Sequence, residues 1–186
     1  MAQLSAWQRW WMGAWPHRFR LRWRVPRFLR MCPTPFRGEV LEVGAGKGWT
    51  SRRILETFPQ VELTAVDVDE AAAAAFRRLS KVYGNRLHVQ QATAEALPFD
   101  RGKFDFVLAI NVMAHLTPLE REHSLTEFLR VLKPGGLLGI SQATMFGPAS
   151  DIWEDVKQQL AQEHCEVLFV STRSGFDVWA RKEYRD

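Results

Sequence analysis

Residues 39–48 read EVLEVGAGKG, and this stretch decides the fold. The short apolar run EVLEVG predicts a β-strand, and a helical pattern follows from about residue 49 to 58. Between them, Gly44, Gly46 and Gly48 allow a tight turn that presents backbone amides at a helix N-terminus. The stretch therefore predicts a strand–turn–helix unit whose turn is suited to a ligand, although glycine-rich turns also occur without one.

Outside this stretch, short apolar runs continue to alternate with helical patterns, which predicts an α/β domain with helices on both faces of a parallel sheet. The residues 117–120, Thr-Pro-Leu-Glu, predict a capped helix start. The last two strands are joined by a turn too short for a crossover, so we expect them to pair antiparallel. The expected strands are 39–44, 61–66, 87–91, 104–111, 137–141, 166–171 and 176–181, and the expected helices are 49–58, 70–83, 117–133 and 150–163.

Ligands of open parallel sheets bind at the carboxyl ends of the strands, where Asp67 ends the second strand. It lies 19 residues after Gly48, at a distance suited to accepting hydrogen bonds from ribose hydroxyls. Asp69 is better placed to cap the following helix. The third glycine comes one residue earlier than in the dinucleotide pattern G-x-G-x-x-G, and position 49 is Trp49. This spacing disfavours a pyrophosphate ligand.

Four segments in this order resemble the class I S-adenosylmethionine-dependent methyltransferases, of the small-molecule, type 11-like kind. The resemblance runs from about residue 39 to 182 and implies a Rossmann-like, seven-stranded, mostly parallel sheet with strand order 3-2-1-4-5-7-6. It also implies S-adenosylmethionine as the cofactor. The segments are VLEVGAGKG (40–48), AVDVDE (65–70), ATAEALPFDRGKFDFVLAINVMAHL (92–116) and LRVLKPGGLLGIS (129–141).

The resemblance also implies a set of cofactor-binding residues. The methionine half would be lined by Gly44, Ala45, Gly46 and Gly48, with Glu42 beneath its amino group. Asp67 would hold the ribose hydroxyls, and Val68 would lie against the adenine. Thr93 stands where the family usually has an aspartate on the adenine amino group, so the Ala94 backbone would contribute more to adenine recognition. Asn111 and Val112 would lie near the sulfonium.

His115 is the candidate catalytic residue, because it follows the fourth strand next to the expected methyl group. An unperturbed imidazole has a pKa near 6.5, which suits removal of a proton from an acceptor; otherwise His115 is a hydrogen-bonding loop residue. The sequence after this strand lacks the Asn/Asp-Pro-Pro-Tyr/Phe motif of amino-group methyltransferases, and neither cysteine is near the site or has zinc spacing. We therefore expect a small-molecule acceptor (a natural product, quinone or lipid-like compound), methylated on oxygen or carbon, and no metal site.

Residues 1–38 form a separate arm before the cofactor domain of residues 39–186. The arm holds eight arginines and no acidic residue, whereas the rest of the chain, with 17 basic and 21 acidic residues, has a net charge of −4. After an N-terminal helical stripe of tryptophans, the stretch RFRLRWRV (18–25) alternates arginine with apolar residues, which predicts an extended segment. This arm would be a lid over an anionic or aromatic acceptor, or a contact of residues 1–30 with an anionic membrane surface.

Two other functions stay open at this point: a catalytically inactive cofactor-binding partner subunit, and an RNA-modifying enzyme that uses the arginines of the arm on phosphates. The local placement of the positive charge disfavours nucleic acid as a general partner. Cysteine usage predicts a cytoplasmic protein, with peripheral membrane contact left open. The sequence does not predict an oligomeric state.

Overall fold

The computed structural model describes residues 24–69, 72–143, 149–172 and 175–183. The chain divides into two compact units, Met1–Met31 and Cys32–Asp186. The division between them comes after residue 31, whereas the sequence analysis divides the chain after residue 38. Residues 32–37 belong with the second unit, where the Phe36 ring packs 4.6 Å from the Phe106 ring and 4.9 Å from that of Phe58. The expected tryptophan helix of the arm lies outside the described residues.

The described part of the first unit is a helix over residues 24–30. Its residues Val25, Phe28 and Leu29 share one helical face by their spacing. The expectation of an extended stretch through residue 25 is therefore wrong for Arg24 and Val25, because this apolar spacing matches a helix better than a strand. Residues 18–23 lie outside the described part.

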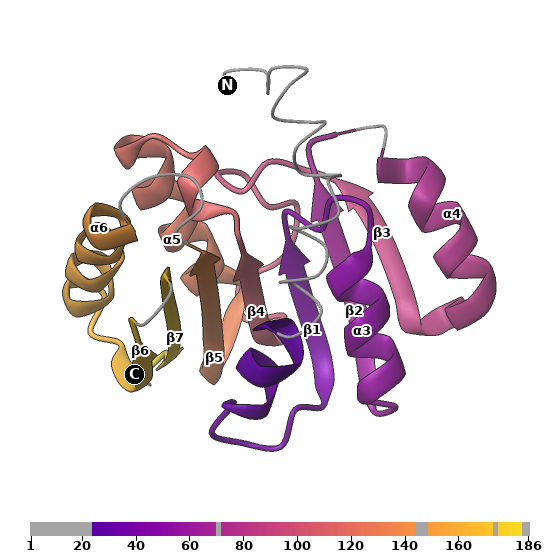
Figure 1. Cartoon of the computed structure of the whole chain (residues 1–186), viewed down its shortest axis with the longest axis horizontal. Helices are drawn as coiled ribbons and strands as arrows, with labels where there is room; N and C mark the ends of the chain where they lie inside the picture. The colour runs from indigo at the N-terminus through magenta and orange to yellow at the C-terminus, as the bar shows by residue number, and fades with distance from the viewer. Residues whose placement is uncertain (1–23, 70–71, 144–148, 173–174, 184–186) are drawn as a thin grey trace. The chain divides into compact units, whose positions relative to one another are not determined.

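The second unit contains a seven-stranded sheet of order β3-β2-β1-β4-β5-β7-β6, as the resemblance implied (Figure 1). Strands β1 to β5 are parallel, and β7 runs antiparallel to both β5 and β6. The strands are β1 (Gly38–Val43), β2 (Val61–Asp67), β3 (Leu87–Gln91), β4 (Phe104–Ile110), β5 (Leu132–Ala143), β6 (Glu166–Ser171) and β7 (Gly175–Arg181), and the helices are α3 (Trp49–Thr57), α4 (Ala72–Tyr83), α5 (Pro118–Val131) and α6 (Ala149–Gln162), with short 3₁₀ turns η1 (Gly84–Arg86) and η2 (Met113–His115).

Alternate residues of β1 face different helices, which shows how the two faces are covered. Leu41 and Val43 belong to a buried cluster with Leu125 and Phe128 of α5 and with residues of α6. On the opposite face, the Glu42 carboxylate accepts a hydrogen bond from Ser51 of α3. The sheet is thus enclosed by α5 and α6 on one face and by α3 and α4 on the other (Figure 1).

Strand β5 begins earlier than the sequence predicts. We expected the helix to end at residue 133 and the strand to start at 137, but β5 follows α5 directly at Leu132, which pairs with Phe104. Backbone hydrogen bonds from Gly135 N–H to Lys182 O and from Lys182 N–H to Gly136 O draw the Pro-Gly-Gly segment into the sheet. These long-range pairings override the local turn signal of this segment.

The start of α5 confirms the predicted capping box. The Thr117 hydroxyl accepts a hydrogen bond from Glu120 N–H at 3.3 Å, and the Glu120 carboxylate accepts one from Thr117 N–H at 2.7 Å. This reciprocal pair fixes where the loop after β4 ends and the helix begins. Among the residues that the structure describes, no helix is long and apolar enough to cross a membrane.

Candidate active site

The three glycines of the turn between β1 and α3 all have positive φ angles, +69°, +52° and +74°, but they have different surroundings. A Cβ atom on Gly44 would lie 2.5 Å from Val112, and one on Gly48 would lie 2.5 Å from Leu79. These two glycines allow close packing of the turn against β4 and α4. Among the described residues, a Cβ atom on Gly46 would meet nothing within 4 Å, so Gly46 faces open space within this part of the chain.

The backbone amides of this turn are directed into the protein. Gly44 N–H and Ala45 N–H both donate to Val66 O, at 2.9 and 3.1 Å, and Gly46 N–H donates to the Asp67 carboxylate at 2.6 Å. The expectation that the turn presents its amides to a ligand is therefore wrong for these three groups. A pyrophosphate would find an aspartate here in place of free donors, which agrees with the glycine spacing.

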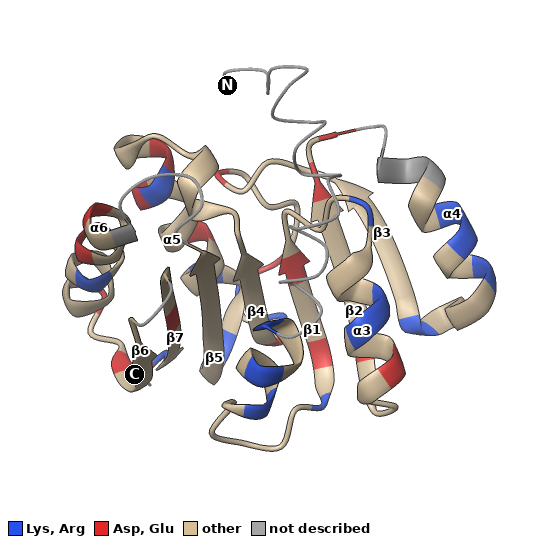
Figure 2. Ribbon diagram, viewed as in Figure 1, with Lys and Arg blue, Asp and Glu red and all other residues tan. Residues whose placement is uncertain are grey.

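Asp67 is held in one orientation by backbone groups on both sides. Its Oδ2 accepts the hydrogen bond from Gly46, and its Oδ1 accepts one from Asp69 N–H at 2.9 Å. Each carboxylate oxygen keeps a further lone pair, so the side chain is prepared to accept from two adjacent hydroxyls such as those of a ribose. Figure 2 shows acidic residues at the carboxyl ends of both β1 and β2.

The acidic residue of β1 is Glu42, which is buried with 2% of its surface exposed. Its carboxyl accepts a hydrogen bond of 2.5 Å from the Ser51 hydroxyl. Burial raises the pKa of Glu42 to about 8, opposed by hydrogen bonds from Ser51 and Thr50 and reinforced by the negative charge of Asp67. An incoming ammonium group would favour the ionised form of Glu42 and so suits this position.

Glu42 makes the stability of the cofactor-free protein depend on pH. Because its pKa is raised on folding, its contribution is complete below about pH 4.5 and is lost as the pH rises towards about 8. Over that window we expect the free energy of unfolding to fall, relative to Glu42→Gln, by up to about 1.4 kcal/mol for each pH unit. Urea denaturation of both proteins between pH 5 and 9 measures this difference. Parallel curves for the two would contradict the assignment.

Gly46 and Gly84 provide a matched pair for testing the open space in front of the turn. Their φ angles are +52° and +54°, and a Cβ atom on either meets no described residue within 4 Å, but Gly84 lies in η1, before the amino end of β3. We expect alanine at either position to lower stability by about 1–2 kcal/mol. Only Gly46→Ala is expected to weaken cofactor binding as well, by about 1–3 kcal/mol, because the methyl group enters the cofactor space. Equal affinities of the two variants in calorimetry would move the cofactor away from Gly46.

The residues expected around adenine lie beside Asp67. Val68 exposes 47% of its surface, and its carbonyl accepts a hydrogen bond from Gln91. The segment after β3 is joined to β2 by a hydrogen bond from Ala92 N–H to Asp67 O at 3.2 Å. The structure therefore brings Thr93, which is half-buried, and the buried Ala94 to the same end of the sheet as the glycine turn.

The residues after β4 complete the strand-end site. Asn111 has a φ of +57°, and its side-chain oxygen accepts a hydrogen bond from Ala143 N–H at 2.9 Å, which ties β4 to β5. This oxygen supports the shape of the site, whereas Val112 lies directly against Gly44. His115 is the last residue of η2, in the connection between β4 and α5, and it is exposed.

Sequence reasoning missed Gln142, which is fully buried in β5 beside this loop. Its side-chain oxygen accepts a hydrogen bond from Ala114 N–H at 3.2 Å, so the side chain connects β5 to η2. A long polar side chain at the carboxyl end of the strand, after the apolar run of residues 137–140, was the available signal.

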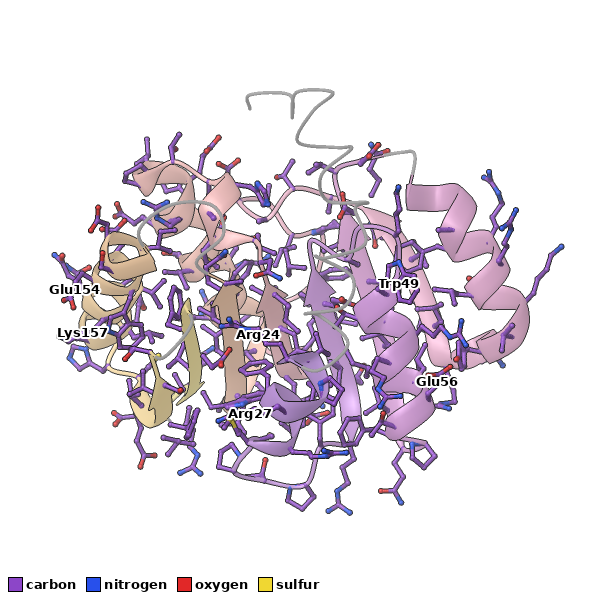
Figure 3. All side chains as sticks on the ribbon, in the orientation of Figure 1. Arg24, Arg27, Trp49, Glu56, Glu154 and Lys157 are labelled. Atoms are coloured by element: carbon purple, nitrogen blue, oxygen red, sulfur yellow. The ribbon has the colours of Figure 1, made fainter. Side chains whose placement is uncertain are left out.

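Trp49, the first residue of α3, stands at the position where a dinucleotide site has its third glycine (Figure 3). It exposes 49% of its surface.

Together, the fold and the strand-end residues define a class I S-adenosylmethionine-dependent methyltransferase. The chain belongs to the family described as "Methyltransferase domain", whose pattern matches residues 40–136. Its cofactor is S-adenosylmethionine, and the acidic pair with the open space at Gly46 fits that cation.

Comparisons with individual proteins agree with this family. The chain is 35% identical to the ubiquinone/menaquinone biosynthesis C-methyltransferase UbiE of Geobacter sulfurreducens over 53% of this chain and 39% of that protein. It is 36% identical to the fatty-acid O-methyltransferase of Mycolicibacterium smegmatis, over 62% of this chain and 40% of that protein. A solved S-adenosylmethionine-dependent methyltransferase from Aquifex aeolicus superimposes with a TM-score of 0.64 at 25% identity, covering 77% of this chain and 81% of that one. The chain spans less than half the length of these two curated relatives.

Proposed function

We propose that the protein transfers a methyl group from S-adenosylmethionine to oxygen or carbon of a small, lipid-like, quinone or natural-product acceptor. The observation that carries the proposal is the fixed Asp67 carboxylate, which accepts a hydrogen bond from Gly46 N–H at the carboxyl end of the sheet and interacts electrostatically with the buried Glu42. The names of two relatives, a quinone C-methyltransferase and a fatty-acid O-methyltransferase, support an apolar acceptor.

The bound cofactor supplies an electrophilic methyl group on a sulfonium. When bound, the cofactor would supply this methyl group to an electron pair of the acceptor atom, and the electron pair of the carbon–sulfur bond would remain on sulfur. Positioning and exclusion of water provide much of the acceleration of such a displacement. In this proposal His115 accepts the proton when the acceptor arrives protonated, while Glu42, Gly46 and Asp67 hold the cofactor.

A methyl-transfer screen tests the proposed acceptor class. The protein is incubated with S-adenosylmethionine labelled in its methyl group and with separate pools of lipid extract, small polar metabolites and RNA. We expect label in the organic extract of the lipid pool. Label in the RNA pool alone would replace the proposal with nucleic-acid modification, and cofactor binding without label in any pool would favour a catalytically inactive partner subunit.

We also propose that the N-terminal arm completes the acceptor pocket. Deletion of residues 1–30 is expected to leave cofactor affinity unchanged and to abolish turnover with the acceptor that the screen identifies. Vesicle sedimentation of both forms, with and without anionic lipid, tests the alternative of a membrane contact. Sedimentation of the full-length protein alone, weakened by salt, would show that the arm is an anchor. Unchanged turnover without sedimentation would contradict both roles.

A further inference from the structure

Helix α5 carries an arginine near each end, and each of the two holds a different loop that contributes residues to the site. Near the start of the helix, Arg121 is buried, and its Nη1 donates to Leu116 O at 2.6 Å and to Met113 O at 3.3 Å. Its Nε and Nη2 both donate to the Asp155 carboxylate of α6, at 3.0 and 2.7 Å. The guanidinium therefore connects η2 and Leu116 both to α5, which carries it, and to α6.

Arg130, in the last turn of the same helix, repeats this arrangement on the other loop. Its Nη1 donates to Phe99 O at 2.7 Å and its Nη2 to Leu97 O at 2.8 Å. The Glu127 carboxylate accepts from the Arg130 guanidinium at 2.6 and 2.8 Å and also accepts from Leu97 N–H at 2.8 Å. The hydrogen bond from Arg130 lowers the pKa of Glu127, so this carboxylate stays ionised at neutral pH.

The two held segments lie at opposite ends of α5. Residues 113–116 lie at the carboxyl end of β4, whereas Phe99 lies beside the start of β4, where its ring packs 5.1 Å from that of Phe104. Leu97 and Phe99 lie in the loop between β3 and β4, which begins at the carboxyl end of β3 and includes Thr93 and Ala94, the residues expected around adenine. Met113 and Leu116 flank the turn that includes His115, on the methyl side. One helix therefore fixes both loops, through separate contacts at its two ends.

Only a planar fork of donors can make this set of contacts. A guanidinium offers five N–H donors in fixed directions and serves one carboxylate and two carbonyls together, whereas a lysine ammonium keeps the charge but not the fork. A lysine at either position has one donor nitrogen in place of the three spread over the guanidinium, so we expect at least one loop carbonyl to lose its partner and the loop to shift.

We propose that Arg130 and Arg121 are positioning residues that separately set the adenine side and the methyl side of the site. Arg130 holds the loop after β3 and so governs cofactor affinity. Arg121 holds η2 and so governs the orientation of His115. The second assignment rests on the proposed function of His115, whereas the first rests only on the cofactor of the family.

Two lysine variants on the same helix serve as controls for each other when cofactor affinity is measured. Calorimetric titration with S-adenosylhomocysteine, the product of methyl transfer, is compared for wild type, Arg130→Lys, Arg121→Lys and Arg181→Lys, the last of which changes an exposed ion pair with Glu166. We expect Arg130→Lys to weaken binding by roughly two- to thirty-fold, in the range of residues that act on a site through others. Arg121→Lys and Arg181→Lys should bind like wild type. Equal weakening by Arg130→Lys and Arg121→Lys would indicate a general loss of stability and overturn the proposal, as would unchanged binding by Arg130→Lys.

Hydrogen exchange tests the two contacts without any ligand. In the free protein we expect Arg130→Lys to speed exchange in peptides covering residues 93–99 and Arg121→Lys to speed it in peptides covering 112–117, each leaving the other segment unchanged. Acceleration of both segments in either variant would overturn the separate roles. A wild type that does not bind S-adenosylhomocysteine would refute the cofactor assignment, while the exchange result would still decide on the contacts.

Discussion

Replacing Asp67 with alanine is expected to remove one or two hydrogen bonds between its carboxylate and S-adenosylmethionine. Each such bond to a charged group contributes about 1.5–3 kcal/mol to the binding free energy. The carboxylate is already aligned by Gly46 N–H and Asp69 N–H, so it accepts ribose hydroxyls without first being ordered. Its removal also leaves those two amides without their acceptor and loosens the turn. Calorimetry with the cofactor, together with thermal unfolding, separates the two effects.

Two further variants make the Asp67 measurement specific. Asp67→Asn keeps one acceptor oxygen and should lie between wild type and alanine in affinity. Glu56→Ala changes an exposed acid in the last turn of α3, at the opposite end of that helix from the glycine turn, and should bind the cofactor like wild type. Wild-type affinity of Asp67→Ala would remove this residue from the cofactor site.

Replacing His115 with glutamine is expected to lower turnover by roughly 10²–10⁴-fold while cofactor affinity stays nearly constant, if His115 is the general base. The residue is exposed at the end of η2, on the loop that follows Asn111 and Val112 at the carboxyl end of β4. Initial rates are measured with the acceptor found in the methyl-transfer screen, over a range of pH. The wild-type rate should rise with the ionisation of a single group, and this limb should be absent from the variant.

His123 supplies the matched control, since it is an exposed histidine on the outer surface of α5. His123→Gln should keep the full rate and the full pH profile. A His115→Gln enzyme that also keeps them would show that positioning alone drives the transfer, and would leave His115 as a hydrogen-bonding loop residue.

Local patterns predicted most of the fold. The strand and helix bounds follow from short apolar runs and from strong stop and start signals, of which the capping box of Thr117 and Glu120 is the clearest. The start of β5 was misplaced because it depends on pairing with Phe104 and Lys182, which no local signal contains. The helix at residues 24–30 was missed because alternating arginines suggested a strand.

Parts of the candidate site were predictable because the residue type and its position in the sequence indicate its chemical role. Asp67 ends β2 and Gly46 lies in the turn after β1, and the structure brings them into hydrogen-bond contact. The inward direction of the turn amides was not predictable, because it depends on the register of β1 against β2. The contacts of Arg121 and Arg130 likewise depend on where α5 lies over the two loops, and arginines on a helix give no sign of which carbonyls they reach.

Parallel calorimetric titrations of the wild-type protein with S-adenosylhomocysteine and with NAD test the central claim most directly. The claim is that the turn of residues 44–48 and Asp67 form an S-adenosylmethionine site and not a dinucleotide site. We predict one molar equivalent of S-adenosylhomocysteine bound, with no binding of NAD at the same concentrations, because Gly44, Ala45 and Gly46 donate their amides within the protein and the Asp67 carboxylate lies where a pyrophosphate would need donors. Binding of NAD at this site, or failure of S-adenosylhomocysteine to bind the folded protein, would contradict the claim.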